Sequence, residues 1–349
     1  MNMVSNNFLS DNHDVSLILS RGIPDIWVGV LYFLSGERFE NLAKLNLPHP
    51  FQEGTETLNH FDILTFGVNP DARFALWNPA TDKFKVIPHS PDMFQPFAAD
   101  VNSDVINFHS SRDVHGFGYD MRTHDFKVIS HVSFRAPRLN PRKGFVALGD
   151  TSIERFWEIY SLRSNSWRKL DVVMPTTTYG NGITMGVYLN GLCHWGCIIG
   201  HFHSKRESNL VSFDLSNDVF FTTPIPMDID RCINVDNKCS WRDLAVLNGS
   251  IALITYQEQM ATFNISILSE LTVKESWIKL FIVGPLSCVE RPFGVGKGKI
   301  FFKKKVKKLA WFDLSTQMIE DLDVKGGDSR GYRIVVYKEN LLPIGGINK

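Results

Sequence analysis

The sequence has no excess of charge of either sign, because 37 Lys and Arg balance 37 Asp and Glu among its 349 residues. Nucleic acids and anionic membrane surfaces are bound by clustered positive charge. The composition therefore gives no reason to expect a nucleic-acid or membrane partner. Its proportions of hydrophobic residues (44%) and charged residues (21%) are instead those of an ordinary globular protein.

Long apolar runs are also absent. The longest, residues 26–34, has nine residues, whereas a helix that crosses a bilayer needs about 20. The first 14 residues are polar and lack the basic start and apolar stretch of a secretory signal. We therefore expect a soluble protein of the cytoplasm, the nucleus or both.

Cysteine is scarce, and its odd number of copies is typical of a reducing compartment rather than of a disulfide framework: Cys193, Cys197, Cys232, Cys239 and Cys288. Only Cys193 and Cys197, with His194, His201 and His203 nearby, could suggest a metal site. Their spacing differs from that of common zinc knuckles. On a strand, Cys193 and Cys197 would share one face and His194 would point away. Buried core cysteines explain this pattern better, and we expect no metal.

Regular amphipathic helices are hard to find. Aromatic and β-branched residues come in short runs separated by Asn-Gly, Asn-Pro, Gly-Gly and Ser/Asp clusters, as at residues 74–77, 126–134, 157–162, 251–256 and 333–337. Such runs between turn formers are typical of antiparallel strands. The sequence therefore predicts an all-β fold.

One pattern recurs five times: an aromatic residue, then Asn, Asp or Ser, then a large apolar residue seven positions after the aromatic. The copies are Trp77-Asn78 with Phe84, Tyr119-Asp120 with Phe126, Tyr160-Ser161 with Trp167, Phe213-Asp214 with Phe220, and Phe312-Asp313 with Ile319. The small polar residue can bond its own backbone at a turn. Each copy predicts a hairpin whose two apolar side chains face the same side and pack on a neighbouring sheet.

A second hairpin signal precedes several copies. Asn190-Gly191 and Asn248-Gly249 lie between apolar runs, and residues 296–299 hold the same place in the next unit. Two hairpins in series make a four-stranded sheet of about 45–55 residues, the size of a propeller blade. We place sheets at residues 62–88, 115–173, 182–226, 241–283 and 290–324, of which the first is short and the fourth has a longer turn in place of the repeat.

The pieces left over, residues 28–47 and 332–344, are each about half a sheet. Their pairing would join the N- and C-terminal strands, close a ring of six four-stranded blades and remove the exposed edges of an open array. Five or seven blades are the alternatives.

Four blocks stand in an order known from one family: Leu76-Trp77-Asn78-Pro79-Ala80-Thr81, His115-Gly116-Phe117-Gly118-Tyr119-Asp120, Tyr160-Ser161-Leu162-Arg163-Ser164-Asn165-Ser166-Trp167 and Val273-Lys274-Glu275-Ser276-Trp277. Over residues 30–345 the chain resembles the F-box-associated (interaction) domain of plant F-box proteins, itself similar to a kelch-like β-propeller. The resemblance implies a protein-binding module that acts as the substrate receptor of a Skp–cullin–F-box ubiquitin ligase. Such a module recruits a target for ubiquitination, without catalysis of its own and without a cofactor.

The family's F-box, a helical segment with a Leu-Pro start and a Lys-x-Trp near its end, is not matched. Ser16-Leu17-Ile18-Leu19-Ser20-Arg21 weakly resembles one F-box helix, but neither motif flanks it. We therefore divide the chain into an N-terminal segment without a complete F-box, residues 1–26, and the propeller domain, residues 27–346. Ordinary binding to the Skp-type adaptor is not expected. The alternatives are a degenerate family member without a ligase role, and a propeller lectin or enzyme.

Two other motifs have both a functional and a structural interpretation. Gly294-x-Gly296-x-Gly298-Lys299 lacks the spacing of a phosphate loop and has Ile300 where Ser or Thr is needed, so a glycine-rich hairpin turn is the better explanation. The run Lys303-Lys304-Lys305-Val306-Lys307-Lys308 could bind an anionic partner or direct nuclear import. In a chain of zero net charge we favour a solvated hairpin loop.

The predicted blades separate two kinds of connection. Turns within the first and second hairpins are tight and share one face, whereas the connections on the other face are long: residues 88–114, 135–153, 198–208, 227–240 and 284–291. Long surface loops commonly carry binding residues. We expect the protein partner there, with Phe94, Phe97, Phe202, His203 and Met227 as contacts, because aromatic and apolar anchors dominate interface energy. The alternative is that these loops are tolerated insertions.

Overall fold

The computed structural model describes residues 15–22, 29–46, 56–59, 63–66, 73–79, 81, 83–91, 109–135, 138–139, 146–147, 152–172, 186–199, 207–230, 239–324 and 331–338. The regular structure in these ranges is almost entirely β-strand, and a short 3-10 turn, η4 (Lys274–Ser276), precedes one of the strands. Across the same ranges, no helix is long and apolar enough to span a membrane. The predicted all-β class is confirmed.

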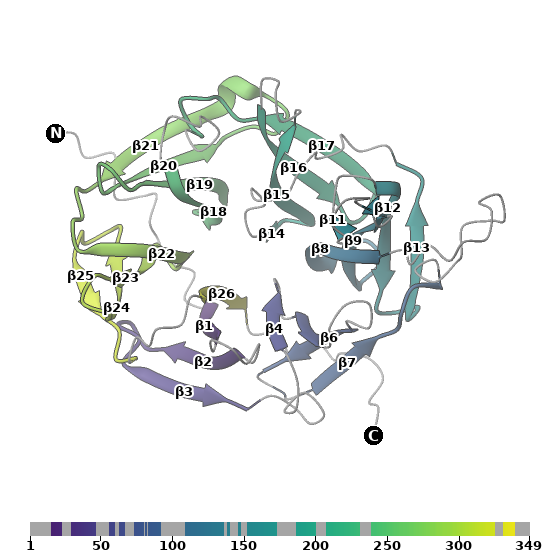
Figure 1. Ribbon diagram of the computed structural model, residues 1–349, viewed down its shortest axis with the longest axis horizontal. Helices are drawn as coiled ribbons and strands as arrows, with labels where there is room; N and C mark the ends of the chain where they lie inside the picture. Colours follow the sequence, from purple (N-terminus) through teal and green to yellow (C-terminus); the bar gives the residue numbers. More distant parts are fainter. Residues whose placement is uncertain are drawn as a thin grey trace.

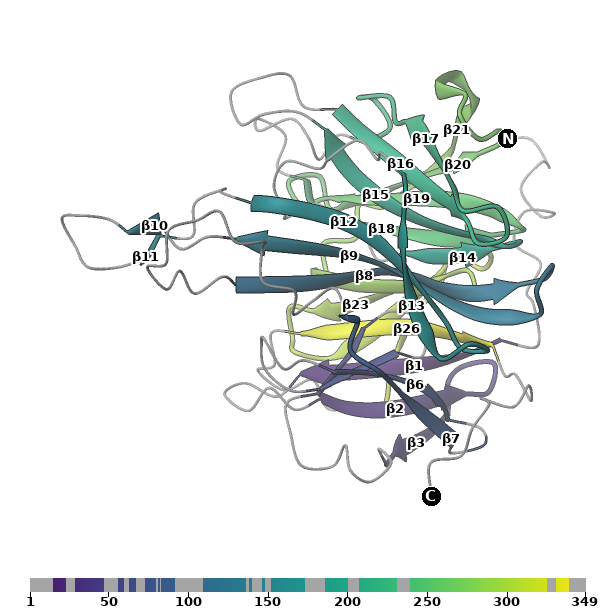
Figure 2. The ribbon, with the colours of Figure 1, turned by 90° about the vertical axis from the view of Figure 1, so that its right-hand side faces the viewer.

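Six four-stranded antiparallel sheets make up the described part, arranged around a common axis (Figure 1). In order of pairing, the strands of each sheet are β26 (Tyr332–Lys338), β1 (Val15–Gly22), β2 (Gly29–Ser35) and β3 (Asn41–Leu45); β4 (Glu56–Asn59), β5 (Ile63–Phe66), β6 (Arg73–Asn78) and β7 (Lys83–Ile87); β8 (His109–Asp120), β9 (Asp125–Arg135), β12 (Ser152–Ser161) and β13 (Ser166–Leu170); β14 (Val187–Leu189), β15 (Leu192–Ile199), β16 (Glu207–Asp214) and β17 (Val219–Pro224); β18 (Cys239–Leu247), β19 (Ser250–Gln257), β20 (Thr262–Leu268) and β21 (Trp277–Val283); and β22 (Val289–Gly296), β23 (Lys299–Lys304), β24 (Leu309–Asp313) and β25 (Ile319–Asp321). This is a propeller of four-stranded blades. A two-stranded ribbon, β10 (Arg138–Leu139) with β11 (Val146–Ala147), extends away from the sheets (Figure 2).

The seven-residue repeat forms hairpins as predicted. Its two apolar residues are directly opposite each other in every copy: Trp77 and Phe84, Tyr119 and Phe126, Tyr160 and Trp167, Phe213 and Phe220, Phe312 and Ile319. The polar residue bonds the turn, because the carboxylates of Asp120, Asp214 and Asp313 each accept from the backbone N–H two residues later, at 2.9, 2.8 and 2.7 Å. In these three copies the aspartate side chain therefore stabilises its own turn by a hydrogen bond.

Most of the described core lies between the sheets. Six clusters of buried side chains each join two neighbouring sheets. Strand β1 serves two of them, since Leu17 packs with Phe301 of β23 while Ile18 packs with Trp77 of β6. Successive side chains of a strand point to opposite faces, so a strand buried on both sides is apolar throughout.

The N-terminal part differs from the prediction. Residues 15–22 form strand β1, which pairs with β26 on one side and β2 on the other, so the propeller begins before residue 27. Its sheet takes three strands from the N-terminal part and one from the C-terminal part, where two from each were expected. An apolar run as short as Leu17 to Leu19 fits a buried strand and a helix equally well, which is why the strand was missed.

The sheet expected at residues 62–88 also begins earlier, at Glu56. Its strands β4 and β5 have four residues each, which lets an inner hairpin fit into the short stretch before Phe74. The longer turn expected in the fourth unit is present, because residues 269–276, including η4, join β20 to β21.

Candidate interaction surface

The connections between strands lie on two faces of the propeller, at the right and the left of Figure 2. The tight-turn face holds residues 121–124, 162–165, 190–191, 215–218, 248–249, 297–298 and 314–318. The loop face holds the connections between second and third strands and between sheets, whose described parts include residues 225–230, 258–261, 284–288 and 305–308. The intramolecular contacts of the polar groups on each face indicate how available that face is to a partner.

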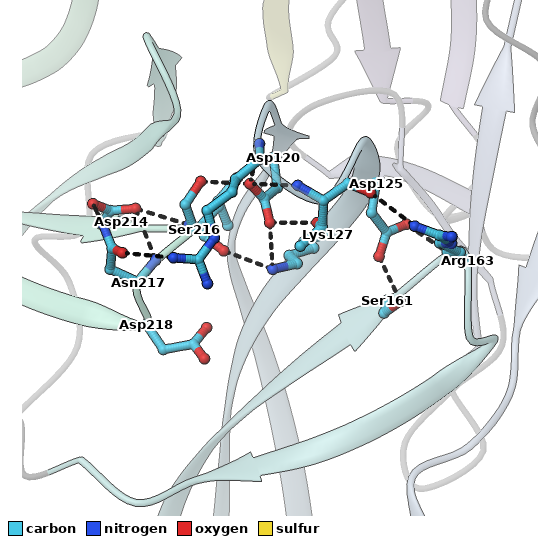
Figure 3. A network of polar contacts seen from close by, with 12 residues as sticks. Asp120, Asp125, Lys127, Ser161, Arg163, Asp214, Ser216, Asn217 and Asp218 are labelled. Atoms are coloured by element: carbon cyan, nitrogen blue, oxygen red, sulfur yellow. Dashed lines mark hydrogen bonds and ion pairs between the residues drawn. The ribbon is translucent and has the colours of Figure 1, made fainter.

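A polar network joins two sheets on the tight-turn face (Figure 3). The Nζ atom of Lys127 lies 2.7 Å from Oδ2 of Asp120 and donates to the carbonyl of Leu215 at 2.7 Å, while the hydroxyl of Ser216 also donates to Asp120. Burial favours a higher pKa for Asp120, but hydrogen bonds from Lys127, Ser216 and Thr123 hold that pKa well below its usual range. The β8–β9 turn is thus fixed to the β16–β17 turn of the next sheet.

Asp125 extends the network within its own sheet. Its carboxylate accepts from the Ser161 hydroxyl at 2.5 Å and from the Arg163 backbone N–H at 2.8 Å, which ties the β8–β9 hairpin to the β12–β13 turn (Figure 3). Asp120 and Asp125 are both buried. Carboxylates held by intramolecular donors stabilise the turns and have little capacity left for a partner.

On the loop face, an ion pair fixes the segment between β17 and β18. Nη1 of Arg242 lies 2.5 Å from Oδ2 of Asp230 and donates to the Ser208 hydroxyl at 3.3 Å. Ile225 and Ile229 of this segment are buried. Met227 points outward between them and is 54% exposed.

Backbone hydrogen bonds join three further loop-face connections. The N–H of Leu286 donates to the carbonyl of Ala261 at 2.7 Å, and the N–H of Lys305 donates to the carbonyl of Cys288 at 3.0 Å. Exposed apolar side chains occur here, but Met121 on the tight-turn face is also exposed. Apolar exposure alone therefore does not distinguish the two faces.

The predicted partner contacts are only partly described. Met227 is exposed on the loop face, whereas Phe94, Phe97, Phe202 and His203 lie outside the described residues. Their role as a group stays a prediction.

Cys193 and Cys197 are core residues of strand β15, as predicted. Both are free thiols with at most 2% exposure, and His194 is buried on the opposite face, with Nδ1 2.8 Å from the Ser212 hydroxyl. Burial raises the pKa of Cys197 to about 12 and lowers that of His194 to about 4. Among the described residues, no three His, Cys, Asp or Glu side chains are placed to hold a metal.

The glycine-rich segment is a hairpin, as predicted, and its first glycines have a packing role that the sequence did not reveal. Lys297 and Gly298 form the β22–β23 turn with positive φ. A Cβ at Gly296 would lie 2.7 Å from Cδ2 of Leu17 in the next sheet. Gly116 serves β8 in the same way, since a Cβ there would lie 2.5 Å from the Cβ of Cys193. These glycines let an inner strand approach the neighbouring sheet closely.

The lysine run is a hairpin between β23 and β24, as predicted. Lys303 pairs with Glu290 at 3.0 Å, and Lys304 and Lys308 pair with Asp321 at 2.6 and 3.2 Å.

Buried ionisable side chains at two places in the fold were not singled out by sequence reasoning. Nη2 of Arg112 lies 2.7 Å from Oε1 of Glu158, and its guanidinium lies 4.3 Å from the ring centre of Trp167. On β18, burial raises the pKa of Asp243 to about 7, and the hydrogen bond from the Leu244 backbone N–H and the charge of Arg333 offset this only in part. A single charged residue in a strand usually faces solvent, so only the packing of the sheets reveals these as buried.

Comparison with known proteins agrees with this fold. The model of the F-box associated beta propeller domain matches residues 36–340. Relatives in Arabidopsis thaliana include the F-box protein CPR1, 26% identical over 80% of this chain and 67% of that protein, and an F-box/kelch-repeat protein, 24% identical over 72% of this chain and 59% of that protein. Among solved structures, a DUF4784 family protein from Bacteroides caccae has a TM-score of 0.41 at 11% identity, over 93% of this chain and 74% of that one, and such a weak likeness supports no conclusion. Because the family model spans most of the chain, the protein belongs to the F-box associated beta propeller domain family.

Proposed function

We propose that the protein is the substrate-recognition part of a Skp–cullin–F-box ubiquitin ligase, which binds a target protein and brings it to be ubiquitinated in the cytoplasm or the nucleus. The family match over residues 36–340 carries this proposal, together with relatives named as F-box proteins. In this role the six four-stranded sheets act as six blades, and the pairing of β1 with β26 closes the ring.

The loop face is the proposed binding face for the target. On the tight-turn face, Asp120, Asp125 and Lys127 are occupied by intramolecular contacts. In addition, Val15 of β1 pairs with Lys338 of β26 at the tight-turn end of their sheet, where a first hairpin turn would otherwise lie. The beginning of β1 therefore lies on the tight-turn face, and this supports the loop face as the one available to the target.

We infer that contact with the Skp-type adaptor is not made by the stretch that resembles an F-box helix. Residues 16–21 are part of strand β1, and Leu17, Ile18 and Leu19 are completely buried between two sheets. Adaptor binding through this stretch would require β1 to leave its sheet. The adaptor contact of a working ligase would then come from another segment.

Substitutions on the two faces test the proposed binding face. Phe97→Ala with Phe202→Ala is expected to abolish capture of the target and to leave the melting temperature nearly unchanged. The control is Asn190→Asp with Asn248→Asp on the tight-turn face, where Asn190 and Asn248 have left-handed φ values of 50° and 48° that aspartate tolerates. Capture that survives the first pair and vanishes with the second would place the site on the opposite face.

A further inference from the structure

The methionines in the described part of the chain lie on its surface. Methionine commonly fills gaps in apolar cores, yet all four described copies are exposed on connections between strands. Met227 and Met260 are on the loop face, with exposed fractions of 54% and 61%. Met121 and Met318 are on the tight-turn face, with exposed fractions of 67% and 54%. Their thioethers are therefore accessible to small oxidants.

The segment around Met227 is fixed, so the exposure of this side chain is built into the fold. The N–H of Ile225 donates to the carbonyl of Ser208 at 2.8 Å. The N–H of Ile229 donates to the carbonyl of Pro226 at 2.9 Å, which closes a turn around Met227. Ile225 and Ile229 are buried in one apolar cluster. Met227 is therefore held outward between two residues that the core fixes.

Oxygen added to the sulfur of Met227 has different effects on the fold and on a bound partner. In water the sulfoxide oxygen stays hydrated, and the buried side chains of Ile225 and Ile229 continue to hold the turn. In an interface the same oxygen puts a polar group in place of an apolar contact and loses its water. Since a few anchors carry most of the energy of an interface, this change weakens binding while the fold stays intact.

We propose that Met227 is a site of reversible oxidation, at which a peroxide weakens binding of the target. The sulfur attacks one oxygen of hydrogen peroxide and the O–O bond breaks. The hydrogen of the transferred oxygen moves to the departing hydroxide, which leaves as water. Sulfur loses two electrons in this step and the peroxide gains them. The inference rests on the proposed function, since it gives the regulation of the same loop-face site.

The reverse step uses a second class of reactant. A methionine sulfoxide reductase takes two electrons from a pair of thiols, removes the oxygen as water and leaves a disulfide on the reductant. The exposed position of Met227 admits such an enzyme, because the sulfur lies on a surface turn. Oxidation at this residue therefore changes the binding face without permanent damage.

Met318 provides a matched control within the same chain. Its exposed fraction equals that of Met227, but it lies on the opposite face. Peroxide is expected to oxidise both residues at similar rates, so the two differ only in the face that they modify. Cys288 on the loop face is a free thiol of intermediate exposure and is also open to peroxide. Dithiothreitol restores sulfenic acids and disulfides but leaves sulfoxides, which separates the two kinds of oxidation.

The test treats the full chain with hydrogen peroxide and then with dithiothreitol, and peptide mass spectrometry measures the sulfoxide at each methionine. The binding probe is the set of proteins whose capture from plant-cell extract depends on Phe97 and Phe202. Met227→Leu and Met318→Leu are compared with the wild type, because leucine keeps a similar apolar volume and cannot be oxidised in this way. Met260 is retained in every variant.

Oxidised wild type is expected to capture the probe at least about fivefold more weakly, with an unchanged melting temperature, and methionine sulfoxide reductase should restore capture. Oxidised Met227→Leu should capture like the untreated protein, and oxidised Met318→Leu should lose capture like the wild type. Lost capture in oxidised Met227→Leu would overturn the proposal. Full capture by wild type with Met227 completely converted would overturn it as well, as would a melting temperature that falls on oxidation.

The untreated proteins test the proposed function separately. Capture by the wild type that is the same with Phe97→Ala and Phe202→Ala would reject the proposed binding face, and this inference with it. Capture that depends on Phe97 and Phe202 but is insensitive to oxidation would reject only the role of Met227.

Discussion

The carboxylate of Asp120 connects two sheets, so we expect its replacement to destabilise the fold and not only its own turn. It is completely buried and accepts from Lys127, Ser216 and Thr123. We expect Asp120→Asn to lower the free energy of unfolding by about 1–3 kcal/mol, because the substitution leaves the ammonium of Lys127 without its ion pair. Urea unfolding measures the change. Asp228→Asn, which breaks the exposed pair with Lys279, should stay within about 0.5 kcal/mol, and equal effects of the two substitutions would contradict this account.

His194 makes stability depend on pH through its buried, neutral ring. Burial lowers its pKa to about 4, below the value of about 6.5 in an unfolded chain, so between these values the unfolded state binds more protons. Its contribution is complete above pH 6.5 and is lost as the pH falls towards 4. The advantage of the wild type over His194→Gln in urea unfolding should shrink by about 2–3 kcal/mol between pH 7.5 and pH 4.5.

The wild type must be compared with His194→Gln because Asp243 changes the pH dependence of stability in the opposite direction. Its raised pKa of about 7 means that the folded state keeps a proton that the unfolded state has lost, so its contribution falls as the pH rises from 4 to 7. The two trends partly cancel in the wild type alone. A difference between wild type and His194→Gln that does not change with pH would contradict the assignment to His194.

Among the strands, the approach of β8 to the next sheet depends on glycine. A Cβ at Gly116 would lie 2.5 Å from the Cβ of Cys193, which is backbone-fixed and cannot rotate away. We expect Gly116→Ala to lower the free energy of unfolding by about 1–3 kcal/mol through overpacking. The control is Gly331→Ala, where no atom lies within 4 Å of the added Cβ. Thermal unfolding of both variants measures the effect, and equal stability would show that the sheets have room to shift.

Hairpins were predicted well because their signals are local. The repeat of an aromatic residue, a small polar residue and a second apolar residue specifies a turn that closes on itself, and Asp120, Asp214 and Asp313 show that bond. Particular contacts between strands that are not joined by a hairpin turn were not predicted, because they depend on residues far apart in sequence. The packing glycines, the Arg112–Glu158 pair of β8 and β12, and the pairing of β1 with β26 all belong to this second class. The loop-face contacts at Phe94, Phe97, Phe202 and His203 are still a prediction.

At the scale of the whole molecule, strand β1 links the two ends of the chain into one sheet. It pairs with β26 over residues 15–21 and with β2 over residues 17–22. Removal of residues 1–22 would expose the edges of β26 and β2 and open the clusters around Leu17 and Ile18. We expect this truncated chain to lose its single cooperative unfolding transition and to aggregate.

The matched control removes residues 1–13 and keeps β1 whole. It should unfold cooperatively, with a melting temperature close to that of the full chain. A cooperative transition that survived the removal of residues 1–22 would show that the sheet does not need β1.

In the proposed function, the propeller presents a target protein for ubiquitination through its loop face. The most direct measurement is quantitative mass spectrometry of ubiquitin conjugates on proteins captured by the wild type in plant cells with the proteasome inhibited, compared with cells that express Phe97→Ala with Phe202→Ala. We predict that at least one captured protein carries less ubiquitin with the double variant and keeps wild-type levels with Asn190→Asp and Asn248→Asp. Captured proteins whose ubiquitin conjugates are the same with the wild type and both variants would contradict the account.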